Sequence, residues 1–285
     1  MSLLRIHASP GRTASWVLSW FLFTAGIAVY LYVAQQRHRE NPDDRVMPTA
    51  IQVIHGFAEA ALKPAAEDEE NVEDGTRLPF LTRVRSSVLW KDTAATGRRF
   101  LISVALLFPA VLLGLHMAMF PYIGAFFLRF IQFFDKIVAL SLLPILFIAF
   151  GIDELAKIML IVVGVTPTII LDTFNLGKSV PREQIVKAFT LGAADFAVTY
   201  RIIFKQIWPR VLNSIRLNLK AVMLFLFAGE MIASTDGLAY RIALLRRHMG
   251  MDTIIPYVLW VALLLFLVDL GMHTFNRKMH PWFQE

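Results

Sequence analysis

The sequence predicts an all-α integral membrane protein with about six transmembrane helices. Of its 285 residues, 56% are hydrophobic and 23 are phenylalanine, whereas about 45–50% apolar residues is usual in a soluble domain. Several apolar runs reach the length of about 18 residues that allows a helix to cross a bilayer. The formal net charge of +6 is interpreted as a sign of membrane topology rather than of nucleic-acid binding, because lysine and arginine gather in the cytoplasmic loops of membrane proteins.

Six apolar runs give the expected spans. They are residues 16–33, 100–119, 137–152, 158–176, 211–233 and 254–275, with Ala125 as an alternative start for the third. An even number of spans places both termini on one side of the membrane. Arg5 and Arg12 precede the first span. Arg277 and Lys278 follow the last, so the positive-inside rule makes this side cytoplasmic. No small-residue cleavage site follows the first run, which favours a retained helix over a signal peptide.

The spans divide the chain into four segments. These are residues 1–35 with the first helix, 36–93 outside the membrane, 94–276 as the main membrane domain, and 277–285 as a cytoplasmic tail. Between residues 37 and 98 lie 11 of the 22 acidic residues, and the run EDEENVEDG at 67–75 is typical of solvated, disordered chain. Residues 46–62 have apolar side chains at helical spacing and predict a short helix on the outer face.

A basic, half-polar segment connects the fourth and fifth spans. Residues 187–209 read KAFTLGAADFAVTYRIIFKQIWP, in which aromatic residues such as Phe189 and Phe196 recur at roughly helical spacing. A glycine inside a helix costs about 1 kcal/mol relative to alanine, so we expect Gly192 to have a packing or turning role. Pro209 is expected to end the helix before the fifth span. Two interpretations are open: a helix that grips another protein, or an amphipathic helix on the bilayer surface.

Three polar residues share one face of the fifth span, because Asn213, Arg216 and Lys220 lie at positions i, i+3 and i+7. Ionisable residues inside spans are hypotheses of function by default, since each costs a few kcal/mol on insertion scales. The stripe either attracts an anion along a transport pathway or consists of long cations that reach for the surface. Arg216, near the helix start, favours the second interpretation, whereas both stay open for Lys220.

Four other ionisable residues have expected structural roles. Asp172 and Glu230 lie near span ends, where helix pairing or an interfacial position is expected rather than contact with solute. Asp135 and Lys136 are adjacent in sequence, so their side chains are expected to point apart instead of forming a facing pair. We expect these two residues to mark the cytoplasmic start of the third span.

The composition excludes several kinds of chemistry. The chain has no cysteine, which excludes disulfides, thiolate metal sites and cysteine nucleophiles. Its histidines are scattered without the spacing of metal ligands, and neither G-x-x-x-x-G-K-[ST] nor G-x-G-x-x-G occurs. We therefore expect no catalytic residue, no metal site and no cofactor in this chain, and any ATP must be bound by a partner.

The connecting segment resembles the cytoplasmic EAA loop of permease subunits of bacterial ABC importers. That loop reads Glu-Ala-Ala, three residues, Gly, and then a stretch ending in Ile-x-Leu-Pro. Ala188 matches its second alanine, Gly192 its glycine and Ile202 its isoleucine. Phe204 stands for the leucine, and Pro209 is the last proline of the two-step ending. The pattern also has departures: Val186 and Lys187 replace the glutamate and first alanine, and Lys205 replaces the first proline.

The surrounding sequence is similar to permeases for nitrate, bicarbonate, taurine and alkanesulfonates. The similar stretches are MPTAIQV (47–53), FGIDELAKI (150–158), SVPREQIVKAFTLGAA (179–194) and AGEMIASTDGLAYRI (228–242). Asp269 in the last span falls where the family has aspartate. The resemblance covers most of the chain from Met47 onward.

The resemblance implies a type I ABC importer permease fold over residues 94–276, with a coupling helix at about 181–200. The positions that it assigns to contact with the ATPase are Lys187, Ala188, Gly192, Ala193, Ile202, Phe204 and Pro209. It implies a bacterial inner-membrane protein in a lipid bilayer, with a second permease subunit, a pair of ATP-binding subunits that hold ATP and Mg, a periplasmic substrate-binding protein and no nucleic acid. Homodimer and heterodimer stay open. An anion such as a sulfonate, taurine, nitrate or bicarbonate is the family default, although a phenylalanine-rich interior also suits a larger apolar compound.

Two alternatives from other classes are kept. A secondary transporter needs ion-coupling carboxylates paired at mid-membrane, usually with broken helices in two repeats. A membrane-embedded enzyme or scaffold subunit of an enzyme needs a nucleophile, a base or metal ligands clustered at one depth. The sequence shows neither pattern.

Overall fold

The computed structural model describes residues 12–40, 46–62, 87–247 and 250–283, and within them it contains helices and no strand. The acidic run at 67–75 lies outside the described residues. The helices are α1 (Arg12–Glu40), α2 (Ala50–Leu62), α5 (Val88–Leu106), α6 (Phe108–Met119), α7 (Pro121–Asp135), the 3₁₀ helix η1 (Ala139–Leu142), α8 (Leu143–Phe150), α9 (Glu154–Lys178), α10 (Arg182–Thr190), α11 (Asp195–Ala197), the π-helix η2 (Val198–Ile203), α12 (Phe204–Ala233), α13 (Leu238–Arg247) and α14 (Met251–Met279).

Four helical stretches in the described part are long and apolar enough to cross a membrane. They are Val88–Met119, Glu154–Lys178, Asp195–Ala233 and Met251–Met279. A fifth is obtained if α7 and η1–α8, which are bent by 84° relative to each other, count as one span. α1 is 29 residues long and covers the first predicted span, 16–33, but it is not among these stretches, so this span stays a prediction. The total of six stays a prediction.

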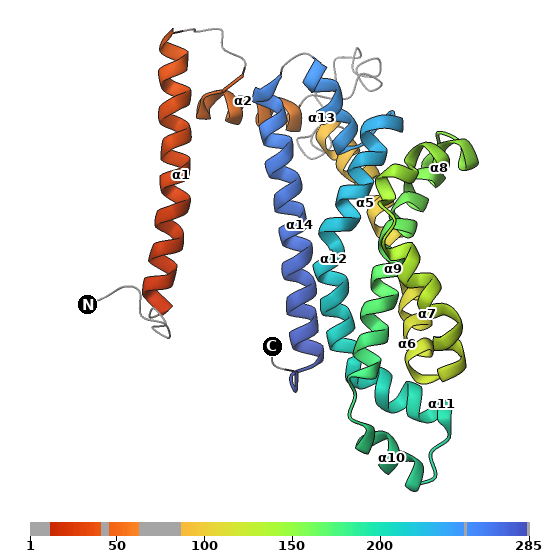
Figure 1. Ribbon diagram of the computed structural model, residues 1–285. Helices are drawn as coiled ribbons and strands as arrows, with labels where there is room; N and C mark the ends of the chain where they lie inside the picture. The colour runs from red at the N-terminus through yellow and green to blue at the C-terminus, as the bar shows by residue number, and fades with distance from the viewer. Residues whose placement is uncertain (1–11, 41–45, 63–86, 248–249, 284–285) are drawn as a thin grey trace, which may run out of the picture.

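The long helices run side by side between two ends of different character (Figure 1). α10 and α11 project at one end, and α13 and α2 lie at the other. We call these the α10 end and the α13 end. α14 finishes toward the α10 end, which is also where α1 begins. The short helix predicted within residues 46–62 is confirmed as α2, which packs on α14 and α5.

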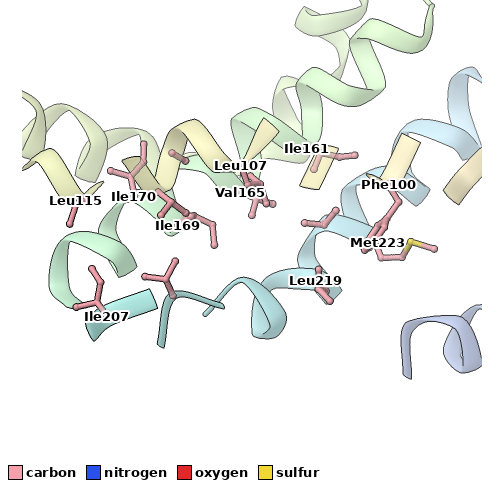
Figure 2. Packing of buried hydrophobic residues seen from close by; sticks show 14 of the residues in the cluster. Phe100, Leu107, Leu115, Ile161, Val165, Ile169, Ile170, Ile207, Leu219 and Met223 are labelled. Atoms are coloured by element: carbon pink, nitrogen blue, oxygen red, sulfur yellow. The ribbon is translucent and has the colours of Figure 1, made fainter. Parts of the chain in front are cut away.

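The core lies where α5 and α6 pack against α9 and α12 (Figure 2). On α9, Ile161, Val165 and Ile169 recur every four residues and are fully buried, because this spacing places them on one helical face. Leu107 and Leu219 meet them from the neighbouring helices, within the same buried cluster. In a bilayer such contacts stabilise through tight packing, since lipid tails are as apolar as the side chains themselves.

The second span begins earlier than predicted, at Val88 rather than at residue 100. Charged residues near this start interrupt the apolar run in the sequence, and they are paired in the fold. Asp92 pairs with Arg241, and Arg99 pairs with three carboxylates. Because their charges are compensated, the helix continues through a stretch that composition alone marks as polar.

The predicted third span also needs correction. α7 begins at Pro121, before both predicted starts, and after Asp135 the chain bends by 84° into η1–α8. Arg129 and Gln132 interrupt the apolar run of α7, which explains why the first half carried a weak signal. The Asp135 region is thus an internal break and not the start of the span.

Pro209 does not end a helix, contrary to the prediction. It is buried within the second turn of α12, which runs on to Ala233. A proline removes one N–H from the helical ladder, and only the first turns of α12 are affected here. The carbonyl of Pro209 accepts a hydrogen bond from the Asn276 side-chain amide of α14 at 2.9 Å.

Candidate functional site

The segment expected to be one helix at about 181–200 consists of two short helices joined by a turn. α10 ends at Thr190, and Gly192 follows with φ of +82°. This left-handed conformation favours glycine, so the expected turning role of Gly192 is observed. A Cβ atom at Gly192 would meet no atom within 4 Å, so the glycine is not needed for packing inside the described chain.

This segment exposes apolar side chains beyond the end of the bundle. Leu191 is 88% exposed, and Val186, Phe189 and Phe196 are also exposed. Of the seven positions assigned by the resemblance, Lys187 and Gly192 are exposed, Ala193, Ile202 and Phe204 are half-buried, and Ala188 and Pro209 are buried. The buried members anchor the segment, and the exposed members are available to a partner.

Aromatic side chains connect the segment to α6. The imidazole of His116 donates from Nδ1 to the carbonyl of Leu112 at 2.7 Å, and its Nε2 lies 2.9 Å from the hydroxyl of Tyr200. The ring of Phe120 stacks on His116 and contacts Phe196. A cavity of about 640 Å³ opens between this cluster and α10. The segment therefore rests on the bundle without filling the space beneath it.

α11, η2 and α12 form one helical stretch of 39 residues, Asp195–Ala233. The six residues of η2 have π-helical hydrogen bonding, a form that is rare and often found at functional sites. The projecting segment at the α10 end is thus continuous with a helix that reaches the α13 end.

The predicted polar stripe on α12 is partly paired. The Arg216 Nε donates to Asn213 Oδ1 at 2.9 Å, and its NH1 lies 3.4 Å from Asp269 Oδ2 of α14. Arg216 thus links two spans instead of extending to the surface. Lys220 is exposed and has no hydrogen bond or ion pair within the described chain. Nearby, Asp172 accepts hydrogen bonds from Ser214 and Asn218, which is the helix-pairing role expected for it.

The largest polar site was missed by the sequence analysis. At the α13 end, six charged residues from four helices and Asp236 from the connection before α13 form what we call the ionic cluster: Asp92, Arg99, Glu154, Lys157, Glu230, Asp236 and Arg241. The Arg99 side chain is 5% exposed, and that of Glu230 is 0% exposed. Buried charges are costly unless they are paired and hydrogen-bonded, so the partners of these groups decide what the cluster does.

Arg99 has acceptors for its whole guanidinium group. Its Nε and NH2 bond to the two oxygens of Glu154 at 2.5 and 2.7 Å, in a bidentate arrangement. Its NH1 bonds to Glu230 at 2.8 Å and to the carbonyl of Asp236 at 3.1 Å, and NH2 also bonds to the Asp236 carboxylate. Glu154 accepts a further bond from Lys157 at 2.9 Å. One arginine thus joins α5, α9, α12 and the residues before α13.

The same cluster caps the N-terminus of α13. The backbone N–H groups of Gly237 and Ala239 donate to Asp92 and Glu230 at 3.1 and 3.2 Å, and that of Leu238 donates to the Thr96 hydroxyl at 2.9 Å. Gly237 has φ of +116°, and a Cβ there would lie 2.7 Å from Glu230 and 2.8 Å from Arg99. These contacts satisfy helix-terminal donors that otherwise have no partner.

Arg241 completes the cluster from α13, with its Nε 2.8 Å from Asp92 Oδ2. Burial lowers the pKa of the Arg241 guanidinium, but the hydrogen bond and the charge of Asp92 outweigh this effect, so the pKa lies above its ordinary value. The Arg241 guanidinium therefore keeps its positive charge.

A sequence signal for the cluster did exist. FGIDELAKI contains Glu154 and Lys157, and AGEMIASTDGLAYRI contains Glu230, Asp236 and Arg241. Both stretches were noted for their family resemblance. What the sequence did not show is that Arg99, far from both in the chain, brings them together.

Asp135 and Lys136 form an ion pair of 3.0 Å, contrary to the expectation that adjacent residues point apart. Lys136 is the first residue after α7, and its long side chain turns back to the carboxylate of its neighbour. The break between α7 and η1 is a discontinuous helix of the kind expected for a secondary transporter. Within the described residues it is the one pair with such a bend, and no group of three histidine, aspartate or glutamate side chains is placed to hold a metal ion.

Comparison with known proteins identifies the family. Residues 110–281 match the family described as binding-protein-dependent transport system inner membrane component. The chain belongs to this family of transport permeases. The taurine transport system permease TauC of Escherichia coli K12 is 29% identical over 203 residues, covering 70% of this chain and 73% of TauC. A probable ABC transporter permease of Brucella melitensis is 27% identical over 206 residues, covering 71% and 82%.

Further similarities agree with this assignment. A putative aliphatic sulfonates transport permease, SsuC of E. coli K12, is 26% identical over 152 residues, or 53% of this chain and 58% of SsuC. Among solved structures, a chain of the MetNI methionine ABC transporter in an inward-facing crystal form superposes with a TM-score of 0.58 at 15% identity, over 71% of this permease and 99% of that chain. This similarity shows the type I permease fold predicted from the sequence, for the part that the match covers.

Proposed function

We propose that this permease is the membrane-spanning subunit of an ATP-driven importer for a small anion, and that its 182–203 segment couples it to a separate ATPase. The observation that carries the proposal is the set of apolar side chains exposed on this segment, led by Leu191. Side chains this apolar are unfavourable in water, and contiguous exposed patches of this kind mark interaction sites. ATP and Mg would be held by the ATPase.

The position of the segment supports coupling. It stands at the α10 end. Exposed cations of the segment and of the adjoining ends of α9 and α12 gather here: Lys178, Arg182, Lys187, Arg201, Lys205 and Arg210. By the positive-inside rule this end faces the cytoplasm, which also places both termini there and leaves the α13 end outside. α11 continues into α12 without a loop, so a displacement of the segment is passed directly to a transmembrane helix.

A small anion is the proposed solute. Two of the relatives described above are named for taurine and aliphatic sulfonates, and Lys220 places an exposed cation on α12. Charge interactions are stronger where water is excluded than in bulk solution. The complete importer would contain a second permease subunit, a pair of ATPases and a periplasmic substrate-binding protein in the inner membrane.

Copurification tests the coupling. The tagged permease should retain its ATPase through purification in mild detergent, whereas Leu191→Asp should lose at least nine-tenths of it by replacing an apolar contact with a charge. Leu191→Met keeps the apolar character and serves as the matched control. Equal amounts of ATPase with both variants would assign Leu191 to lipid rather than to a partner, and no ATPase with the unmodified chain would reject the proposal.

A further inference from the structure

The break after α7 places a charged pair against α9. Asp135 Oδ1 accepts a hydrogen bond from the Thr168 hydroxyl at 3.0 Å, and Oδ2 pairs with Lys136 Nζ at 3.0 Å. The Asp135 side chain is largely covered, whereas the Lys136 side chain is 81% exposed. Asp135 therefore fixes the break to α9, and Lys136 extends away from it.

This pair lies at the middle of the membrane span. α9 runs from Glu154 to Lys178, and Thr166 is twelve residues from either end. Thr168, which bonds to Asp135, lies two residues from that midpoint, or about 3 Å along the axis. Each end of α9 is about 18 Å from the midpoint.

Lys220 lies at the same level on α12. Gly229 packs against Lys157, and Ser214 bonds to Asp172. Lys157 and Asp172 are fifteen residues apart on α9, and Ser214 and Gly229 are fifteen residues apart on α12. The two helices therefore run antiparallel, and residues at equal distances from the paired contacts lie at the same level. Nine residues from Gly229 lead to Lys220 on α12, and nine from Lys157 lead to Thr166 on α9. Two exposed lysines, Lys136 and Lys220, thus occupy one mid-membrane level.

Both lysines need a polar environment at this depth. A lysine at the bilayer centre costs about 2.5–3.5 kcal/mol on insertion scales. The usual escape is to extend along apolar surface to the headgroups, but the ends of α9 lie about 18 Å away, farther than a four-carbon side chain extends. A lysine held at this depth is therefore more favourable beside a water-filled path than among lipid tails.

The two lysines also lie on adjoining parts of the bundle. Ala139 of η1, three residues after Lys136, packs in one cluster with Phe225 of α12. The exposed stripe of α12 includes Leu217, Lys220 and Leu224, and Leu224 is next to Phe225 on the helix. The break in the third span therefore borders the helix that carries Lys220.

We propose that Lys136 and Lys220 form an anion-binding level of the transport path, at the break between α7 and η1. This inference rests on the proposed function, because it assigns the site where the small anion is held within the membrane. With Asp135 the level carries a net charge of +1 in each subunit, so a sulfonate, carboxylate or inorganic oxyanion fits it, and a cation does not. Asp135 acts as a positioning residue, since it directs the Lys136 ammonium and is itself anchored by Thr168.

Single cysteines test this assignment against a clean background, because the chain has none of its own. In the complete importer in membrane vesicles, Lys136→Cys and Lys220→Cys should react with the anionic, water-borne reagent sodium (2-sulfonatoethyl) methanethiosulfonate at least tenfold faster than Ile148→Cys. Ile148 is an apolar, exposed residue of α8 and serves as the control outside the level of the two lysines. Reaction of both lysine positions at the control rate would overturn the proposal.

Transport measurements test the charge itself. Lys136→Met should reduce ATP-dependent uptake of a sulfonate at least tenfold, and Lys136→Arg should retain most of it. If Lys136 variants fail to assemble, the Lys220→Cys and Lys220→Met variants, which leave the Asp135–Lys136 pair intact, decide the outcome. The anion level would be rejected if the complex hydrolyses ATP, Lys220→Met shows normal uptake and Lys220→Cys does not react with the reagent. The proposed function would be unaffected by that result. Absence of any ATPase with the unmodified chain would instead reject the proposed function.

Discussion

The two ends of the bundle differ in the burial and pairing of their side chains. At the α13 end, the centre of the ionic cluster is buried, its members are paired within the chain, and Arg99 alone binds three carboxylates. At the α10 end, the protruding segment exposes apolar side chains, with Leu191 as the extreme case, beside exposed lysines and arginines. The two ends thus differ in how their side chains are partnered: buried charges are paired within the chain at one end, and apolar side chains are left exposed at the other.

This contrast indicates where the chain is complete and where it needs a partner. The ionic cluster uses its donors and acceptors on one another, so it holds α5, α9, α12 and α13 together without help. The 182–203 segment is anchored by buried residues such as Ala188, Val198 and Ile203, whereas its outer apolar side chains have no covering neighbour within the described chain. We infer that the α13 end contributes cohesion and the α10 end contributes recognition, and three substitutions test this division.

Arg99→Met should have the largest effect on stability. It leaves Glu230, which has no exposed surface, without its counter-charge. Removing one partner of a buried ion pair typically costs about 3–5 kcal/mol, which thermal unfolding in detergent would detect. The matched control is Arg98→Met, because Arg98 is the exposed neighbour on the same helix and should change stability by less than about 0.5 kcal/mol. Equal losses for both would mean that the cluster does not hold the α13 end together.

Gly237→Ala should have a smaller but clear effect. At φ of +116° an alanine is strained, and its Cβ would approach both Glu230 and Arg99. Strain of this kind costs on the order of 1–3 kcal/mol, measured in the same unfolding assay. Gly97→Ala on α5 is the control, since no atom lies within 4 Å of its Cβ position and alanine favours a helix. A loss confined to Gly97→Ala would contradict the role given to Gly237.

Leu191→Asp should leave stability nearly unchanged. The side chain is exposed and has little packing to lose, so the free energy of unfolding should shift by less than about 0.5 kcal/mol. The measurement is thermal unfolding of the isolated permease, compared with Leu191→Met. A loss as large as that of Gly237→Ala would show that the α10 end also depends on internal packing. Combined with loss of the ATPase, an unchanged stability would sharpen the contrast between the ends.

Much of the fold was accessible from the sequence, because apolar length is a strong signal for a membrane span. The positions of α9, α12 and α14 agree with their predicted runs to within a few residues, apart from the N-terminal extension of α12 through Pro209. The break after Asp135 was missed, since a polar interruption such as Gln132 shortens an apolar run whether or not the helix continues.

The site was less predictable than the fold. The turn at Gly192 followed from the cost of glycine in a helix, whereas the pairing of Arg99 with Glu230 joins residues 131 positions apart. Periodicity within one helix cannot show which helices become neighbours. The ion pair of Asp135 and Lys136 was excluded by a rule for continuous helices, and it forms because the helix ends between them.

The π-helical turn η2 determines how the residues before it are rotated about the helix axis relative to α12. Each residue of an α-helix advances the chain by about 100° around the axis, and a π turn takes up an extra residue without ending the helix. Everything before Val198 is therefore rotated about the shared axis relative to α12, as compared with an unbroken α-helix. This one turn sets the angle about the helix axis between the side chains of Phe196 and Lys220. Deletion of a single residue within it would change that angle by about 100° while preserving both helices.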